Sequence, residues 1–86
     1  MYKYIIKNNI RVLRFHKDEM TQQALAEQAG VSRQTIVAIE KGKYSPSLDL
    51  AFRISDVFSL PLEEIFTYEV VEETNKHSIK GKKEKK

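Results

Sequence analysis

The sequence predicts a compact all-α fold of five short helices, with a short β-strand at each end of the folded region. The chain has 86 residues, of which 41% are hydrophobic and 31% are charged, a composition that suits one small globular domain. Apolar residues recur at spacings of three and four along much of it, as in amphipathic helices. The chain has no cysteine, which excludes a disulfide scaffold, a thiolate metal site and a cysteine nucleophile.

The first elements are a strand and a helix. Residues 2–7 are rich in aromatic and β-branched side chains and predict a short strand. This segment is too short and too charged to be a secretory signal. Asn8 or Asn9 can cap the helix that follows, which covers roughly residues 9–17. The apolar pair on one face of this helix is Ile10 and Leu13.

Two closely spaced helices come next. The hydroxyl of Thr21 can cap the first of them, and Gly30 stands where a helix ends in the left-handed conformation. Ser32 and Gly42 have the same two roles in the next helix. The two caps are eleven residues apart, and two short helices joined by a tight glycine turn are typical of a helix-turn-helix. The residues predicted to face the core are Leu25, Ala26, Ala29, Ile36 and Ile39.

The folded region ends with two helices and a strand. Ser47 can cap the fourth helix, and Pro61 suits the first position of a short fifth helix that ends near Phe66. Residues 67–71 alternate and favour a strand. If the two terminal strands pair as an antiparallel ribbon, their apolar face would extend the core; if they stay exposed, another chain could join their edge. The apolar face of the fourth helix comprises Leu50, Ala51, Ile54, Val57 and Phe58.

The charge distribution divides the chain into a folded domain over residues 1–71 and a flexible lysine-rich tail over residues 72–86. The tail has a net charge of +3 and the domain is neutral. Within the domain, residues 1–43 carry +4 and residues 44–71 carry −4, which indicates one surface that attracts polyanions such as nucleic acid. No apolar run approaches the roughly 18 residues of a membrane span, so we expect no membrane partner.

The segment between Thr21 and Leu48 closely resembles the phage-repressor and Cro-like helix-turn-helix family, also called the Xre family. The matching stretches read TQQALA, GVSRQTI and IEKGKYSPSL, with small, glycine, cap and apolar positions in register. The resemblance extends over about residues 8–67. It implies a five-helix, lambda-repressor-like fold whose recognition helix, about residues 32–41, enters the major groove of double-stranded DNA.

The first turn of that helix offers groups that can read bases. Arg33 can bond guanine in a bidentate fork, Gln34 can bond adenine, and the Thr35 methyl can touch a thymine methyl. Val37 and Ala38 are short enough to pack on thymine methyls. The alternative is that these side chains are merely a solvated helix surface.

Phosphate contacts would flank the recognition helix. Ser32 as a cap leaves the first N–H groups of the helix pointing outward, where a phosphate can bind. Lys41 and Lys43 have an alternative role, because lysines also favour a helix C-terminus through its dipole. Beside Ser32, the residues that the resemblance assigns to phosphate are Gln22, Lys41, Lys43, Tyr44 and Ser45.

The resemblance also implies a structural ion pair and a dimer. Arg14 and Glu40 would tie the first helix to the third. Family members commonly place five residues between this arginine and the threonine that opens the second helix, whereas this chain has six, so its loop is one residue longer. An interface between two copies would use the terminal strands or the fifth helix, although Ile65 can equally belong to the core. The candidate interface residues are Leu60, Leu62, Ile65, Tyr68 and Val70.

These features predict a sequence-specific transcriptional regulator that acts as a homodimer on a palindromic site. Repression by occupying a promoter is the simplest mechanism, and activation stays open. The alternative is a protein-interaction module of the same fold, such as an antitoxin with a protein partner. We expect no enzymatic activity because there is no catalytic constellation. We also expect no cofactor and no metal, since His16 and His77 lack ligand partners at a suitable spacing, and a cytoplasmic location in a prokaryote.

Overall fold

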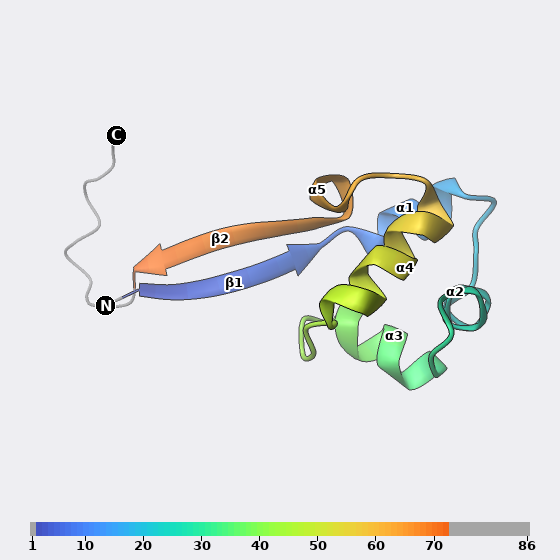
Figure 1. The fold of residues 1–86 in the computed structure, drawn as a ribbon, viewed down its shortest axis with the longest axis horizontal. Coiled ribbons are helices and arrows are strands. Elements are labelled where there is room, and N and C mark those ends of the chain that lie inside the picture. The colour runs from blue at the N-terminus through green and yellow to red at the C-terminus, as the bar shows by residue number, and fades with distance from the viewer. Residues whose placement is uncertain (1, 73–86) are drawn as a thin grey trace.

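The computed structural model describes residues 2–72, which form five helices and one antiparallel pair of strands (Figure 1). The predicted five-helix fold with terminal strands is therefore confirmed. The predicted tail over residues 72–86 lies, beyond Glu72, outside the described residues. The elements in chain order are β1 (Tyr2–Asn8), α1 (Ile10–His16), α2 (Gln22–Ala29), α3 (Arg33–Glu40), α4 (Leu48–Phe58), α5 (Leu62–Ile65) and β2 (Phe66–Glu72).

Hydroxyl caps and glycines set the ends of the central helices, as predicted. Thr21 Oγ1 accepts the N–H of Ala24 at 2.9 Å. Ser32 Oγ accepts the N–H of Thr35 at 3.2 Å, and Ser47 has the same role at the start of α4, at 3.1 Å. Gly30 and Gly42 both adopt a φ of +76°, the left-handed conformation that ends a helix without steric conflict for glycine.

Asn9 occupies the N-cap of α1, but the side chain that bonds the first N–H of the helix is that of Asn8. Asn8 Oδ1 accepts the N–H of Ile10 at 3.1 Å, whereas Asn9 makes no capping bond with its side chain. The amide of Asn8 also donates to the backbone oxygen of Ile39 at 2.9 Å. One side chain thus starts α1 and holds the end of β1 against α3.

The loop between α1 and α2 contains two consecutive residues in the left-handed conformation. Asp18 and Glu19 have φ values of 55° and 53°. The loop is held to α1 because Arg14 Nη1 donates to the backbone oxygen of Met20 at 2.7 Å. The segment expected to be longer than in the family is thus tightly folded and anchored.

The fifth helix is shorter than predicted. Pro61 precedes α5 at its N-cap instead of occupying its first position. Phe66 does not end the helix, because its backbone is extended (φ −118°, ψ 136°) and pairs with Asn8 in the ribbon. Phe66 is therefore the first residue of β2 and not the last residue of the predicted helix.

The core lies between the helices, and the ribbon lies largely outside it. The two strands do pair, with Tyr4 opposite Val70 and Ile6 opposite Tyr68. These four side chains are nevertheless 47–64% exposed, so the expectation that their apolar face would extend the core is wrong. The reason is that the ribbon runs out past the helical body (Figure 1), and its contact with the core is made by Phe66, at the end where Phe66 pairs with Asn8. The fully buried large side chains are Ile10, Leu25, Ile36, Ile39, Ile54 and Ile65.

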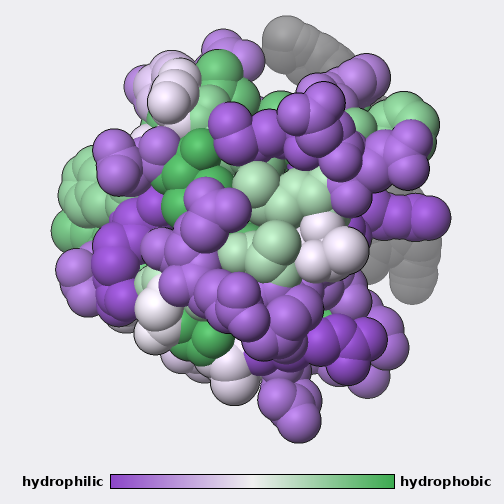
Figure 2. All heavy atoms as spheres, turned by 90° about the vertical axis from the view of Figure 1, so that its right-hand side faces the viewer, coloured by the Kyte–Doolittle hydropathy of each residue, from purple (hydrophilic) through white to green (hydrophobic). Residues whose placement is uncertain are grey.

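The end of the helical body that faces away from the ribbon is covered mainly by hydrophilic side chains (Figure 2). No helix within residues 2–72 is long and apolar enough to cross a membrane.

Candidate nucleic-acid interface

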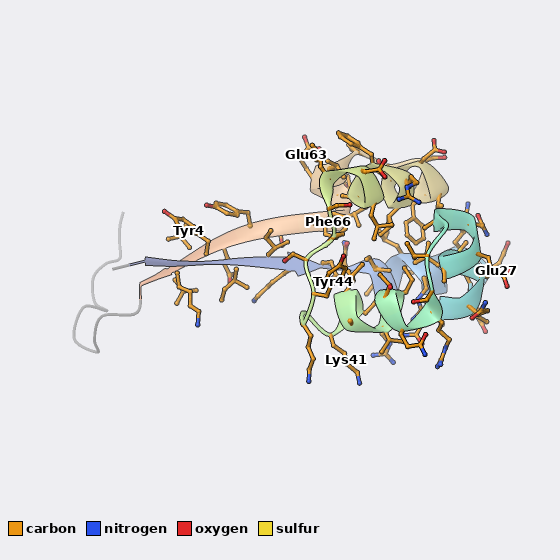
Figure 3. All side chains as sticks on the ribbon, turned by 60° about the horizontal axis from the view of Figure 1, so that its bottom comes forward. Tyr4, Glu27, Lys41, Tyr44, Glu63 and Phe66 are labelled. Carbon is orange, nitrogen blue, oxygen red and sulfur yellow. The ribbon has the colours of Figure 1, made fainter. Side chains whose placement is uncertain are left out.

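Helix α3 presents its first turn to solvent because its other face is anchored in the core. Ile36 and Ile39 are buried, with exposed fractions of 0% and 1%. Arg33 and Gln34 precede them on the outer face and are exposed. The outer face ends at Lys41, which points away from the helical body (Figure 3).

The remaining predicted base-contact residues are less exposed. Thr35 is half-buried, and its hydroxyl lies 3.0 Å from Ser32 Oγ within the cap. Val37 and Ala38, one turn after Arg33 and Gln34, are also half-buried. All five predicted base-contact residues therefore lie on one short helix. Arg33 and Gln34 are the exposed polar residues among them.

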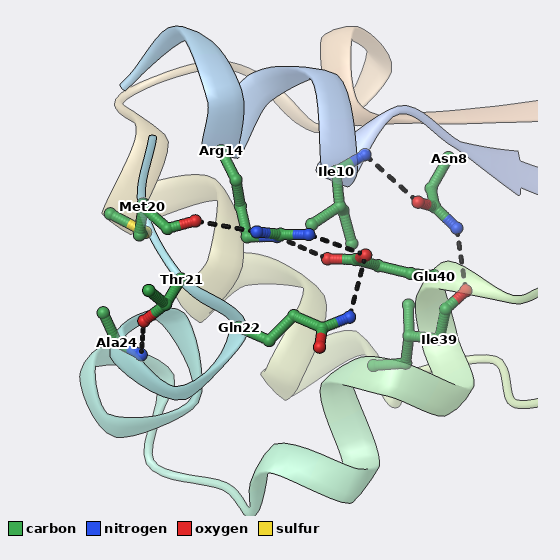
Figure 4. A network of polar contacts seen from close by, with 9 residues as sticks. All are labelled: Asn8, Ile10, Arg14, Met20, Thr21, Gln22, Ala24, Ile39 and Glu40. Carbon is green, nitrogen blue, oxygen red and sulfur yellow. Dashed lines mark hydrogen bonds and ion pairs between the residues drawn. The ribbon is translucent and has the colours of Figure 1, made fainter. Parts of the chain in front are cut away.

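A polar network holds α3 in place from the inner side (Figure 4). Arg14 donates to both carboxylate oxygens of Glu40, from Nε at 2.7 Å and from Nη2 at 3.1 Å. The two side chains are only 15% and 8% exposed, so the ion pair is largely desolvated. Because Arg14 also bonds Met20, the network joins α1, α3 and the loop before α2.

Gln22 belongs to the same network. Its amide Nε2 donates to Glu40 Oε1 at 3.2 Å. The side chain expected to hold a phosphate thus already has a partner within the protein, and a phosphate contact would use its other amide hydrogen or its backbone N–H. Sequence spacing gave no signal for this bond, because it joins residues 18 positions apart.

The predicted phosphate-binding loop follows α3 directly. The N–H of Gly42 donates to Ile39 O at 3.0 Å, and that of Lys43 donates to Ala38 O at 2.9 Å. These bonds fix the loop against the helix end. Lys41, Lys43, Tyr44 and Ser45 are all exposed, as is Ser32 at the opposite end of the helix.

Helix α5 and the end of α3 carry opposite charges on opposite sides of the helical body. Glu63 on α5 and Lys41 after α3 lie on opposite sides of the helical body (Figure 3). Helices α4 and α5 carry the acidic residues Asp49, Asp56, Glu63 and Glu64. The side that carries α3 is therefore the one suited to a polyanion.

The candidate dimer residues separate into three groups. Ile65 is fully buried inside the chain, so its assignment to an interface is wrong: it ends α5 with its side chain in the core. Leu60 and Leu62 are half-buried. Tyr68 and Val70 are 64% and 49% exposed on the ribbon and remain accessible.

The comparisons with known proteins agree with this geometry. The Helix-turn-helix family model matches residues 17–65. An uncharacterised HTH-type transcriptional regulator of Methanocaldococcus jannaschii is 53% identical over 64 residues, which cover 74% of this chain and 96% of that protein. The HTH-type regulator YgzD of Bacillus subtilis is 45% identical over the same shares.

Two further similarities concern a phage protein and a solved structure. The transcriptional repressor RstR of the cryptic phage CTXphi, from Vibrio cholerae, is 31% identical over 71% of this chain and 54% of the repressor. A crystal structure of a provisionally assigned DNA-binding protein from Bacteroides fragilis superposes with a TM-score of 0.63. It is 27% identical and covers 73% of this chain and 100% of that one.

Proposed function

This chain belongs to the helix-turn-helix family of transcriptional regulators, and from this premise we propose that it reads specific sequences in double-stranded DNA with α3. One observation carries the proposal: Arg33 and Gln34 are exposed on the first turn of a helix whose inner face is fixed by the core and by the Arg14–Glu40 pair. A rigid helix that offers polar groups at its first turn suits the major groove.

Each group of that helix has a defined role in this proposal. Arg33 donates to guanine O6 and N7, and Gln34 pairs with adenine N6 and N7. Thr35, Val37 and Ala38 supply methyl contacts to thymine. Phosphates on either side are held by the residues flanking the helix, namely Gln22, Ser32, Lys41, Lys43, Tyr44 and Ser45.

We further propose that two copies bind a palindromic site. The exposed apolar face of the ribbon, with Tyr68 and Val70, supports this, because an isolated two-stranded ribbon is only marginally stable in water. A groove of about 390 Å³ continues this face onto the helical body, where Ile6, Leu62 and Phe66 line it. A second copy would cover both, and its two-fold symmetry would require an inverted repeat.

Repression by occupying a promoter is the simplest mode of action for so small a regulator. The similarity to a phage repressor supports this sign of regulation. If the chain proves to be a monomer in solution with an intact ribbon, the homodimer is overturned. A different protein, as in an antitoxin pair, then becomes the expected occupant of the apolar face.

The test is selection of bound duplexes from a random DNA library at near-physiological salt. We expect enrichment of an inverted repeat with half-sites about 10 base pairs apart. Arg33→Ala and Gln34→Ala should each relax the preference at one base position, at a cost of about 1–3 kcal/mol in discrimination. Arg11→Ala, which removes an exposed arginine from α1, is the matched control and should leave the motif unchanged. Unaltered discrimination in both α3 variants would overturn the assignment.

A further inference from the structure

We propose that the β-ribbon contributes a second DNA-contacting surface, in which Lys3 and Lys7 bind phosphates beyond those held around α3. The inference rests on the proposed function, since it extends the same DNA-binding side. Neither lysine belongs to the helix-turn-helix, and both lie outside the matched residues 17–65.

The ribbon has two chemically different faces, because successive side chains of a strand point in opposite directions. One face carries Tyr4, Ile6, Tyr68 and Val70, and the rings of Tyr4 and Tyr68 stack with centroids 5.4 Å apart. The opposite face carries Lys3, Ile5 and Lys7 on β1. In β2, Thr67, Glu69 and Val71 share this lysine face.

The lysine face is turned toward the DNA-binding side of the molecule. Tyr4 lies on the same side of the ribbon as Glu63, and Lys41 lies on the opposite side (Figure 3). Since Lys3 and Lys7 point away from the tyrosine face, they point to the side of Lys41. In agreement, Lys7 and Lys41 line the same surface hollow of about 270 Å³, between the ribbon and the end of α3.

The charges on this side favour an anion. Lys3 and Lys7 extend the cationic group formed by Lys41 and Lys43, and the acidic groups nearby are already paired. Glu69 contacts Lys7 at 3.3 Å, but the two side chains are 53% and 60% exposed, so this pair is weak and a phosphate can displace it. The carboxylate of Glu40 is occupied by Arg14.

The spacing of the two lysines indicates how far the surface reaches. Four residues of an extended strand span about 13 Å. A duplex rises about 3.4 Å per base pair, so the lysine face would lengthen the contacted DNA by roughly four base pairs. A phosphate contact of this kind adds affinity but no sequence preference.

The experiment measures binding to the selected duplex as a function of salt concentration. The slope of log K against log salt is negative, and each lost phosphate contact makes it less steep by about 0.9. The slope of the double variant Lys3→Gln with Lys7→Gln should therefore be less negative than that of the wild type by close to 2. The change in slope should be the same on specific and on unrelated duplexes. The double arginine variant, which keeps both charges, should retain the wild-type slope.

Two controls separate DNA contact from other effects. Lys17→Gln removes an exposed lysine at the far end of α1 and should leave the slope unchanged. Glu69→Gln breaks the ion pair but keeps both lysines, so it should strengthen binding, whereas a purely structural role of Lys7 predicts no gain. If the wild type selects a motif and the double glutamine variant keeps the full slope, this inference is overturned while the proposed function stands. If the wild type selects nothing, the proposed function itself fails.

Discussion

The Arg14–Glu40 pair is the residue contact on which the position of α3 most depends. It is largely desolvated, and its carboxylate receives two bonds from arginine and one from Gln22. A buried pair of this kind stabilises little compared with an apolar pair, but removing one partner leaves the other charge uncompensated. The main consequence of the pair is therefore geometric, because it fixes the position of α3 relative to α1.

Removing either partner alone should be strongly destabilising. We expect Arg14→Met or Glu40→Leu to lower the free energy of unfolding by about 3 kcal/mol or more. The double variant should lose less than either single variant, since no charge remains unpaired. Urea denaturation followed by far-ultraviolet circular dichroism measures these differences.

The exposed pair on the ribbon provides the comparison. Glu69→Gln removes the partner of Lys7, and its effect on stability should stay within about 0.5 kcal/mol. Equal losses for the buried and the exposed pair would contradict the role given to burial.

At the residue scale, spacing alone predicted the local contacts, whereas the distant Arg14–Glu40 pair was expected only through the family resemblance. The caps at Thr21, Ser32 and Ser47 join atoms three residues apart, so the sequence alone contains the necessary information. The bond from Asn8 to Ile39 spans 31 residues, and that from Gln22 to Glu40 spans 18. Such contacts depend on how the helices pack, which no local pattern records.

At the scale of elements, the turn between α2 and α3 is a contact point for a third helix. Arg53 of α4 donates to the backbone oxygen of Ala29 at 2.6 Å, directly before the glycine that forms the turn. A Cβ added to Gly30 would lie 2.9 Å from Arg53 Nη1. The same addition at Gly42, after α3, would meet nothing within 4 Å.

The two glycines should therefore differ in their tolerance of alanine. Both have a positive φ, so each substitution should lower the free energy of unfolding by about 1 kcal/mol. Gly30→Ala should lose roughly 1 kcal/mol more, because it displaces the arginine from its hydrogen bond. Thermal and urea denaturation of both variants measure the difference.

A second background isolates the contact with α4. In an Arg53→Ala background, the loss caused by Gly30→Ala should fall to that of Gly42→Ala. A difference that persists without the arginine would show that some other neighbour restricts the turn.

Element ends were less predictable wherever two structures compete for one residue. The fifth helix was expected to end near Phe66, but this residue joins β2 because it pairs with Asn8. The choice between a last helical residue and a first strand residue depends on a partner 58 positions earlier in the chain. Helices with a cap and a glycine at their ends faced no such competition.

At the scale of the whole molecule, the sequence indicated the charge asymmetry but not the direction of the ribbon. The sign of each segment follows from counting, and the structure places Glu63 of α5 and Lys41 after α3 on opposite sides of the helical body. Alternation in the terminal strands indicated an apolar face without showing what covers it. Whether such a face meets the core depends on the angle at which the ribbon leaves the helices, which is a property of the assembled fold.

The exposed face of the ribbon leads to a prediction about the assembled regulator. We expect the double variant Tyr68→Lys with Val70→Lys to be a monomer, because it places two like charges at the centre of the proposed interface. Without the interface, each copy binds its half-site independently, so the affinity for the inverted repeat should fall by about 100-fold or more. The affinity for a single half-site should stay near that of the wild type. Sedimentation equilibrium and titration of both duplexes measure these effects. Phe15→Lys introduces one lysine at an equally exposed aromatic residue on α1, at 63% against 64% for Tyr68, and should remain dimeric. A ribbon variant that still sediments as a dimer would place the interface elsewhere, with α5 and the neighbouring Leu60 as the next surface to test.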